Sequence, residues 1–336
     1  MSEPATLEVS DLVKHFPVRG GFLQRQRGVV QAVDGVGFAI RRGETLGLVG
    51  ESGCGKTTVS RMVLKLIEPT AGRIRLGGAD VTDLGPGAMW EHRRRVQIVF
   101  QDPYSSLNPR LTAGAIVGEP LENFRLASGR AKEARVAELF RRVGLRPESM
   151  RHYAHEFPGG QRQRLGIAKA LSVNPDLIVA DEPVSALDVS VRAQVLNLMI
   201  ELQDELALAY LFVSHDLAVV RHISHRIAVM YLGRIVELTD KRTLFSTPLH
   251  PYTEALLAAA PVPDPARRKM KRAVLQGDVP SPMQPPSGCR FHTRCPYAEP
   301  ACRVDDPPLL EVAPGHLVAC LKRPVGGSPA PLPRTT

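Results

Sequence analysis

The sequence predicts an α/β fold built on a largely parallel sheet. The apolar run 45–49 leads into a glycine-rich segment, after which apolar residues recur at helical spacing as far as Pro69. The run Leu177–Ala180 is continuously apolar, as in parallel strands that are buried on both faces. A third apolar run, Leu211–Val213, again ends at polar residues. Open sheets of this kind bind their ligands at the carboxyl ends of the strands.

The composition is that of an ordinary globular protein. The chain has 336 residues, enough for one large domain and a smaller one, and it is 43% hydrophobic and 23% charged. No apolar run reaches the roughly 20 residues that span a bilayer. Residues 1–6 show no signal-peptide pattern, so we expect a cytoplasmic compartment.

The net charge of +9 is compatible with nucleic acid, an anionic membrane surface or neither partner. The clearest basic run, 267–272, lies among prolines rather than on a periodic helix face. We therefore interpret it as a solvated linker.

Short apolar runs separated by turns predict a small antiparallel sheet ahead of the glycine-rich segment. They are Leu7–Val9, Val29–Val30 and Gly37–Ile40. Phe16, in the same region, can stack on an adenine face, although an ordinary packed phenylalanine fits equally well. Further strand signals between residues 74 and 100 end at Phe100, and Gln101 follows directly.

The glycine-rich segment 50–58 fits the phosphate-loop pattern G-x-x-x-x-G-K-S/T, and it lies between a strand and a helix as that motif requires. Glycines let successive backbone N–H groups point inward at the start of a helix, where anions are favoured. Lys56 would reach the terminal phosphates, and the Thr57 hydroxyl would ligate Mg²⁺. The nucleotide-binding residues that this motif predicts are Gly50, Ser52, Gly53, Cys54, Gly55, Lys56, Thr57 and Thr58.

The pattern becomes helical from about Thr112 to Pro158. Residues 131–143 carry an apolar stripe, which predicts a helix facing the core. Pro158 then precedes a further helix, which Gly159, Gly160 and Gln161 open.

Four polar residues follow predicted strands, namely Gln101, Asp181, Glu182 and His215. Because the strand ends meet at one edge of the sheet, we expect these side chains to lie together. The Gln101 amide can meet Mg²⁺ or the attacking water, and Asp181 can hold Mg²⁺. Glu182 can accept a proton from that water, and His215 can contact a γ-phosphate. The set predicts hydrolysis of a nucleoside triphosphate.

As a set, these motifs resemble the ATP-binding subunit of an ATP-binding cassette (ABC) transporter over about residues 7–250. The resemblance implies an ATPase domain at 1–250, with an antiparallel β subdomain, a RecA-like parallel-sheet core and a helical signature subdomain at about 112–165. It also implies nucleotide-binding roles for Gly159, Gly160 and Gln161 and, in the segment Ser185–Asp188, for Asp188.

A narrower resemblance, to the oligopeptide/dipeptide importer ATPases and their nickel-importing relatives, lies in residues 101–109 and 250–257 and in the cysteine-bearing tail. It implies uptake of peptides or a similar small solute by a complex at the cytoplasmic face of the cell membrane. Two ATPase domains would close head to tail around two ATP molecules. Their partners would be two integral-membrane permease subunits and, indirectly, an extracytoplasmic solute-binding protein.

Two other functions share the nucleotide chemistry. A soluble ABC-type ATPase acting on nucleic acid would be expected to interleave aromatic and basic residues, and the sequence shows no such pattern. A small-molecule kinase is disfavoured because the signature, Ser185–Asp188 and His215 occur together.

The signature departs from the pattern of the family it resembles, because Pro158 stands where serine is usual. The lost hydroxyl would meet the γ-phosphate across the dimer interface, while the helix N-terminus would still attract phosphate. We hypothesise that the ATP site using this signature is impaired and that the chain pairs with a second, different ATPase. The alternative is that Pro158 is harmless.

Beyond residue 246 lie 18 of the 29 prolines, which predicts extended structure and turns in an extension at 251–323 and a disordered tail at 324–336. The extension also carries four cysteines. In a reducing compartment their thiols favour a metal over disulfides. Their wide spacing fits zinc poorly, and four-cysteine ligation also suits an iron–sulfur cluster. A third alternative is that these cysteines bind no metal. The resemblance implies a 4Fe–4S cluster, whose ligands would be Cys289, Cys295, Cys302 and Cys320.

Overall fold

The structure is a computed structural model that describes residues 4–20, 25–102, 107–259 and 277–323. The basic run 267–272 and the tail 324–336 therefore lie outside the described residues. Within these ranges, no helix is long and apolar enough to cross a membrane.

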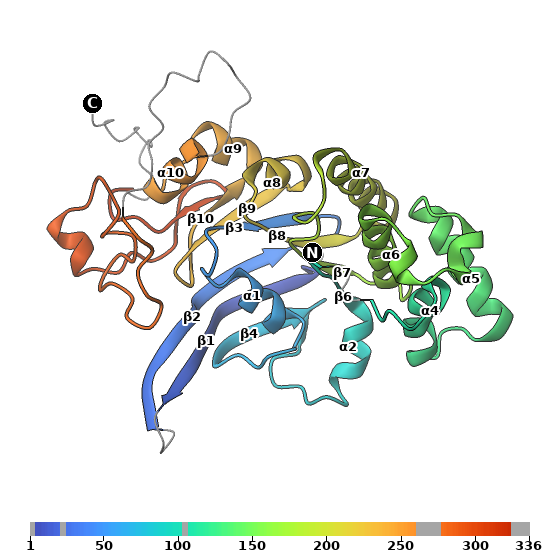
Figure 1. Cartoon of the computed structure of the whole chain (residues 1–336). Coiled ribbons are helices and arrows are strands. Elements are labelled where there is room, and N and C mark those ends of the chain that lie inside the picture. The colour runs from blue at the N-terminus through green and yellow to red at the C-terminus, as the bar shows by residue number, and fades with distance from the viewer. Residues whose placement is uncertain (1–3, 21–24, 103–106, 260–276, 324–336) are drawn as a thin grey trace, which may run out of the picture.

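An eight-stranded sheet forms the centre of the molecule (Figure 1), in the order β11-β12-β10-β9-β3-β8-β7-β6. Its five parallel strands confirm the predicted core; they are β6 (Val96–Val99), β7 (Leu177–Asp181), β8 (Ala209–Ser214), β3 (Thr45–Val49) and β9 (Arg226–Tyr231). The antiparallel strands at one edge are β10 (Arg234–Asp240), β12 (His316–Val318) and β11 (Leu310–Ala313).

Both faces of this sheet are covered, which explains the continuous apolar runs. On β8, Tyr210 and Phe212 pack with the helices of one layer, whereas Leu211 and Val213 pack on the other side against α1 (Lys56–Val63). All six residues of β8 are buried. The helices drawn along the first face in Figure 1 are α7 (Val189–Leu206), α8 (Leu217–Ile223), α9 (Lys241–Ser246) and α10 (Pro251–Ala259).

The predicted antiparallel sheet is present, but its strands are longer than the sequence indicated. It has the order β2-β1-β4-β5. Its strands are β1 (Leu7–Gly20), β2 (Arg25–Ile40), β4 (Ala71–Leu76) and β5 (Ala79–Asp80). The predicted turns between Val30 and Gly37 are wrong, since both lie in β2. Register shifts, such as the one between Val9 and Leu12, interrupt the alternation of apolar residues without ending the strand.

A helical segment, green in Figure 1, forms the end of the molecule that lies farthest from the orange and red C-terminal extension. The predicted stripe is confirmed, because Val136, Leu139 and Phe140 are buried on one face of α5. The Thr112 hydroxyl accepts a hydrogen bond from the Ala115 N–H and so caps α4. The elements are α4 (Ala113–Asn123), α5 (Gly129–Arg142), η1 (Pro147–Arg151), η2 (Ala154–Glu156) and α6 (Gly159–Leu171), and α2 (Met89–Arg95) precedes β6.

The C-terminal extension is part of the main sheet rather than a separate layer. Its strands β12 and β11 continue the sheet beyond β10, and a short helix, η4 (Pro300–Arg303), lies before them. Glu237 on β10 is fully buried, and its carboxylate accepts hydrogen bonds from the N–H groups of Leu249 and His250. It also pairs with His316 of β12 at 2.7 Å. One carboxylate thus joins β10, the segment that leads into α10, and β12 of the extension.

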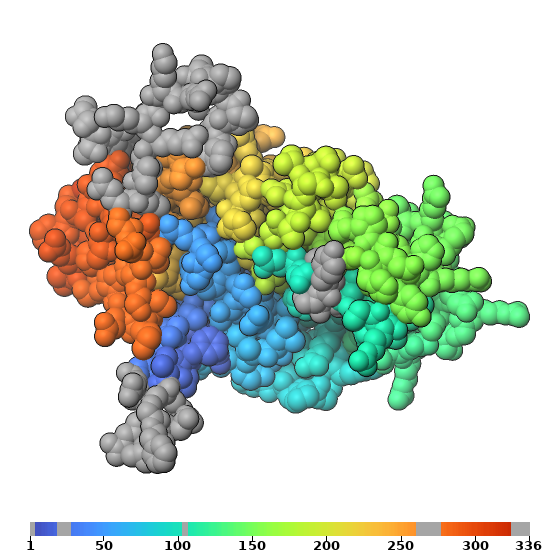
Figure 2. Space-filling view, in the orientation of Figure 1, coloured from blue at the N-terminus to red at the C-terminus, as the bar shows by residue number. Residues whose placement is uncertain are grey.

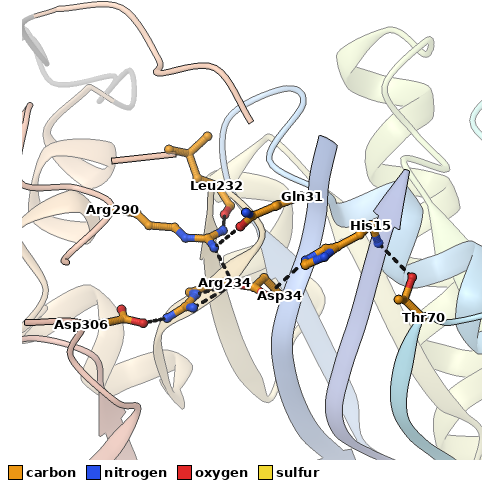
Figure 3. A network of polar contacts seen from close by, with 8 residues as sticks. All are labelled: His15, Gln31, Asp34, Thr70, Leu232, Arg234, Arg290 and Asp306. Atoms are coloured by element: carbon orange, nitrogen blue, oxygen red, sulfur yellow. Dashed lines mark hydrogen bonds and ion pairs between the residues drawn. The ribbon is translucent and has the colours of Figure 1, made fainter. Parts of the chain in front are cut away.

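A second anchor of the extension centres on Asp34 of β2 (Figure 3). The carboxylate pairs with Arg234 of β10 at 2.7 Å, with Arg290 of the extension, and with His15 of β1 at 3.2 Å. Arg234 also pairs with Asp306 of the extension. Burial alone would raise the pKa of Asp34, but the Arg234 hydrogen bond and the Arg290 charge outweigh it and hold the pKa below its usual value.

The buried ring of His250 predicts a pH dependence of stability. His250 is 1% exposed, and its Nδ1 accepts a hydrogen bond from the Tyr252 N–H. Burial lowers its pKa from 6.5 to about 4. The stabilisation from keeping this ring neutral is therefore fully present above the unfolded pKa of 6.5. It is lost as the pH falls from 6.5 towards the folded pKa of about 4.

We expect this ring to lower the free energy of unfolding by about 2 kcal/mol as the pH is lowered from about 7 to about 5, because the ring binds a proton in the unfolded chain but not in the folded one. Urea unfolding measures the change. The matched variant His250→Asn keeps an acceptor for Tyr252 but cannot titrate, so it should lose that much less. An equal loss in both proteins would contradict this assignment.

Candidate nucleotide site

The phosphate loop, residues 50–55, connects β3 to α1 at the carboxyl edge of the sheet. Its glycines are required by close packing. A Cβ on Gly55, whose φ is 111°, would lie 2.2 Å from the Ala32 carbonyl oxygen, and one on Gly50 would lie 2.1 Å from that of Met230. Between these contacts the loop curls around Lys56, whose ammonium group donates to the carbonyl of Gly50 at 2.8 Å.

Of the three groups predicted to hold Mg²⁺, Thr57 and Asp181 lie together, whereas the Gln101 amide contacts Glu182. The Thr57 hydroxyl donates to the Asp181 carboxylate at 3.4 Å, and Asp181 ends β7. Burial raises the pKa of Asp181, and the neighbouring Glu182 charge raises it further. Two adjacent carboxylates favour a cation, and hydroxyl and carboxylate oxygens are ligands that suit Mg²⁺. These residues therefore fit the ion, which would offset charge on the phosphates.

Glu182 lies between the other two residues predicted for hydrolysis. The Gln101 amide donates to one carboxylate oxygen at 3.1 Å, and His215 Nδ1 lies 2.9 Å from the other. These side chains follow β6, β7 and β8, so the parallel pairing brings them together. Glu182 has a φ of 49°, which is uncommon for a residue with a Cβ and is typical of functional turns. The arrangement can orient a water molecule and accept its proton.

The predicted signature residues occupy a different place, at the start of α6. A Cβ on Gly160 would lie 2.2 Å from Val191 of α7, so glycine permits the close packing of these helices. Pro158 and Gln161 are exposed. Within the described part of the chain, no hydrogen bond or ion pair joins residues 159–161 to the phosphate loop.

Asp188 and Phe16 remain predictions as nucleotide contacts. The Asp188 carboxylate caps α7 by accepting from the Val191 N–H at 3.0 Å, and this bond lowers its pKa. Phe16 is 37% exposed on β1, and the Lys14 ammonium group lies 5.1 Å from its ring centroid. The ring is thus not packed in the core.

Comparison with known proteins agrees with this geometry. Residues 33–185 match the family model described as ABC transporter, and residues 236–302 match "Oligopeptide/dipeptide transporter, C-terminal region". The chain is 56% identical to a probable peptide ABC transporter ATP-binding protein of Sinorhizobium fredii, y4tS, over 94% of this chain and 89% of that one. It is 53% identical to the Bacillus subtilis oligopeptide transport ATP-binding protein AppF, over 95% and 98%.

The chain belongs to the ABC transporter family. Among solved structures, it resembles the ATP-binding cassette MJ0796 in a dimeric post-hydrolysis state bound to ADP and Pi, with a TM-score of 0.62 and 28% identity, over 70% of this chain and 99% of that one. The predicted ABC fold and ATPase activity are therefore confirmed. The alternative of a nucleic-acid ATPase receives no support.

The extension of this ABC ATPase holds its four cysteines as free, half-buried thiols. The Cys289 N–H donates to the Cys302 carbonyl at 2.9 Å. Burial, together with the charges of the other cysteines, raises the pKa of Cys289 and Cys295 to about 11. Yet among the described residues, no group of three or more His, Cys, Asp or Glu is placed to hold a metal ion. The expected 4Fe–4S cluster, like the zinc alternative, thus receives no support from this geometry or from the relatives.

Sequence reasoning missed two residues that contact the phosphate loop from far along the chain. The Tyr252 hydroxyl accepts the Glu51 N–H at 2.9 Å, and Arg294 of the extension pairs with the Glu51 carboxylate. No periodic pattern links positions so distant. The available signal was that residues 250–257 and the cysteine-bearing tail resembled the importer ATPases, and it carried no information about contacts.

We expect Glu182→Gln to lower the ATPase rate at least about 100-fold, since a general base contributes on that scale, while leaving MgATP affinity nearly unchanged. Single-turnover hydrolysis and binding of a fluorescent ATP analogue would separate the two effects. Glu201→Gln, at an exposed position of α7, is a matched control that should hydrolyse normally. Wild-type turnover by Glu182→Gln would assign the proton acceptor to another group.

Proposed function

We propose that this ABC ATPase powers the import of peptides or a similar small solute through a membrane permease. The observation that carries the proposal is the match of residues 236–302 to the oligopeptide/dipeptide transporter C-terminal region. Relatives that are 56% and 53% identical over nearly the whole chain are named peptide and oligopeptide transporter ATP-binding proteins. The two matched regions meet in this chain, because Arg290 pairs with Asp34 and Arg294 pairs with Glu51.

The proposed partners are two integral-membrane permease subunits, a second ATPase subunit and, indirectly, an extracytoplasmic solute-binding protein. The chain would act as a peripheral subunit at the cytoplasmic face of the membrane. Support for a second ATPase comes from the exposed start of α6, where Pro158 and Gln161 face solvent. A partner's phosphate loop would meet this surface, and a partner's signature would complete the site at Lys56 and Glu182.

We further propose that the partner is a different ATPase, which would supply a signature with serine. Pro158 provides no side-chain cap at the start of α6, although its carbonyl accepts the Arg162 N–H at 3.0 Å. The helix N-terminus would still attract phosphate, but without the hydroxyl contact. Of the two ATP sites, the one using this signature would then be the weaker.

The test is co-purification of this chain from detergent-solubilised membranes, with ATPase activity assayed on the recovered complex. We expect a permease and a second, distinct ATPase, with turnover reduced by Glu182→Gln. Pro158→Ser should raise turnover about twofold, because it would restore one of two sites. Recovery of the chain with nucleic acid and no membrane partner would overturn the proposed function. An unchanged rate in Pro158→Ser would overturn the asymmetry alone.

We also propose that the four cysteines of the extension ligate a 4Fe–4S cluster. Supporting it are four free thiols, of which Cys289, Cys295 and Cys320 have pKa values raised by burial and by the charges of neighbouring cysteines. In such a cluster each cysteine binds its own iron, so the sulfur atoms need not converge on one point as they would for zinc. The cluster would tie the segments around Cys289, Cys302 and Cys320 together.

We expect anaerobically purified protein to contain about four iron atoms per chain, with matching acid-labile sulfide. Cys295→Ser should lose most of this iron, whereas Cys54→Ser, which changes the phosphate-loop thiol instead, should keep it. Metal analysis by mass spectrometry measures both. Stoichiometric zinc, or protein that is free of metal under these conditions, would rule the cluster out.

A further inference from the structure

A carboxylate lies within the phosphate loop of this chain, where its negative charge would weaken phosphate binding. Glu51 directly follows Gly50 and is part of the segment that surrounds Lys56. A phosphate loop collects N–H dipoles and a lysine charge to attract polyphosphate. An uncompensated carboxylate at this position would repel the same ligand.

The extension supplies the compensating charge. Arg294 forms a two-pronged ion pair with Glu51, at 2.7 Å from Nη1 and 3.1 Å from Nη2. The Arg294 side chain is 5% exposed and that of Glu51 is 26% exposed, so water screens the pair only in part. The Glu51 hydrogen bond raises the pKa of Arg294, which therefore stays charged.

Buried aromatic rings hold Arg294 in this position. It ends a turn that begins at Cys289, and its N–H donates to the Phe291 carbonyl at 3.0 Å. Phe291 is 1% exposed and packs edge-on against Tyr231 with ring centroids 5.2 Å apart. The Arg294 guanidinium lies 5.8 Å from the Tyr231 ring centroid.

The Glu51 backbone is held from the same side. Its N–H donates to the hydroxyl of Tyr252 on α10, whose ring packs 4.7 Å from Tyr231 and 5.4 Å from Phe291. Figure 2 shows the orange and red extension lying beside the blue N-terminal region that contains the loop. Both the main chain and the side chain of Glu51 are therefore fixed by residues C-terminal to the cassette.

We propose that Arg294 is a positioning residue for ATP binding: it neutralises Glu51 and fixes its side chain, so that the extension sets the affinity of the phosphate loop for nucleotide. The inference rests on ATP binding at this loop. It assigns the extension a part in nucleotide binding that acts through Glu51 and is independent of any metal at its cysteines.

The test measures binding of a fluorescent ATP analogue with Mg²⁺ to the purified full chain. Arg294→Ala should raise the dissociation constant about tenfold. This is the effect expected when the uncompensated Glu51 charge lies roughly 10 Å from the phosphates in a medium of effective dielectric constant about 20. The double variant Glu51→Gln/Arg294→Ala should return to within about threefold of the wild type, since the repelling charge is gone. Arg294→Lys should recover part of the affinity, because it keeps the positive charge but cannot form the two-pronged ion pair.

Two further readouts separate charge compensation from general loosening of the fold. The Arg294→Ala defect should shrink as salt is raised to about 0.5 M. In the assembled complex, Arg294→Ala should raise KM for ATP with little change in kcat. The matched control is Arg290→Ala, which removes a guanidinium of similar burial from the same turn but pairs with Asp34 instead; it should bind MgATP within about twofold of the wild type.

Wild-type affinity in Arg294→Ala would overturn the proposal. So would a double variant as weak as Arg294→Ala, because the loss would then come from disrupted packing and not from the Glu51 charge. A wild-type chain that failed to bind MgATP would instead overturn the ATPase function on which the inference rests.

Discussion

The parallel register of β6, β7 and β8 is the constraint on which the hydrolytic site depends. Val99 pairs with Ala180, and Asp181 pairs with Val213, so the three strands end at nearly the same level. The residues that follow these strands, Gln101, Glu182 and His215, therefore place their side chains in contact. The left-handed backbone at Glu182 turns its carboxylate between the other two. A shift of one residue in this pairing would separate the groups, because neighbouring side chains point to opposite faces.

The phosphate loop depends on a second constraint, which comes from elements distant in sequence. Carbonyl groups of β2 and β9 lie against Gly55 and Gly50, and the Gly233 N–H donates to the Cys54 carbonyl. Tyr252 and Arg294 contact Glu51, so the antiparallel sheet, the β9–β10 turn and the extension all contact the loop. Its shape is therefore a property of the whole chain and not only of the glycine motif.

Much of the fold and site could be predicted from the sequence because the information is local. The motif at 50–58, the buried strands before Asp181 and Ser214, and the apolar stripe of α5 are each read within a short window. The lengths of β1 and β2 could not, since bulges break their alternation. Nor could β11 and β12, which are short and lie among prolines. The pairing of Glu51 with Arg294 spans 243 positions and leaves no periodic trace.

The addition of β12 beside β10 has a consequence for association between molecules. In the described structure, Glu237 and Leu238 of β10 pair with β12, so the backbone groups there are satisfied within the chain. The outermost strand becomes β11, which has only four residues and follows two prolines. Short strands next to proline are poor templates for adding a further strand from another molecule. The extension therefore also protects the sheet against edge-to-edge aggregation.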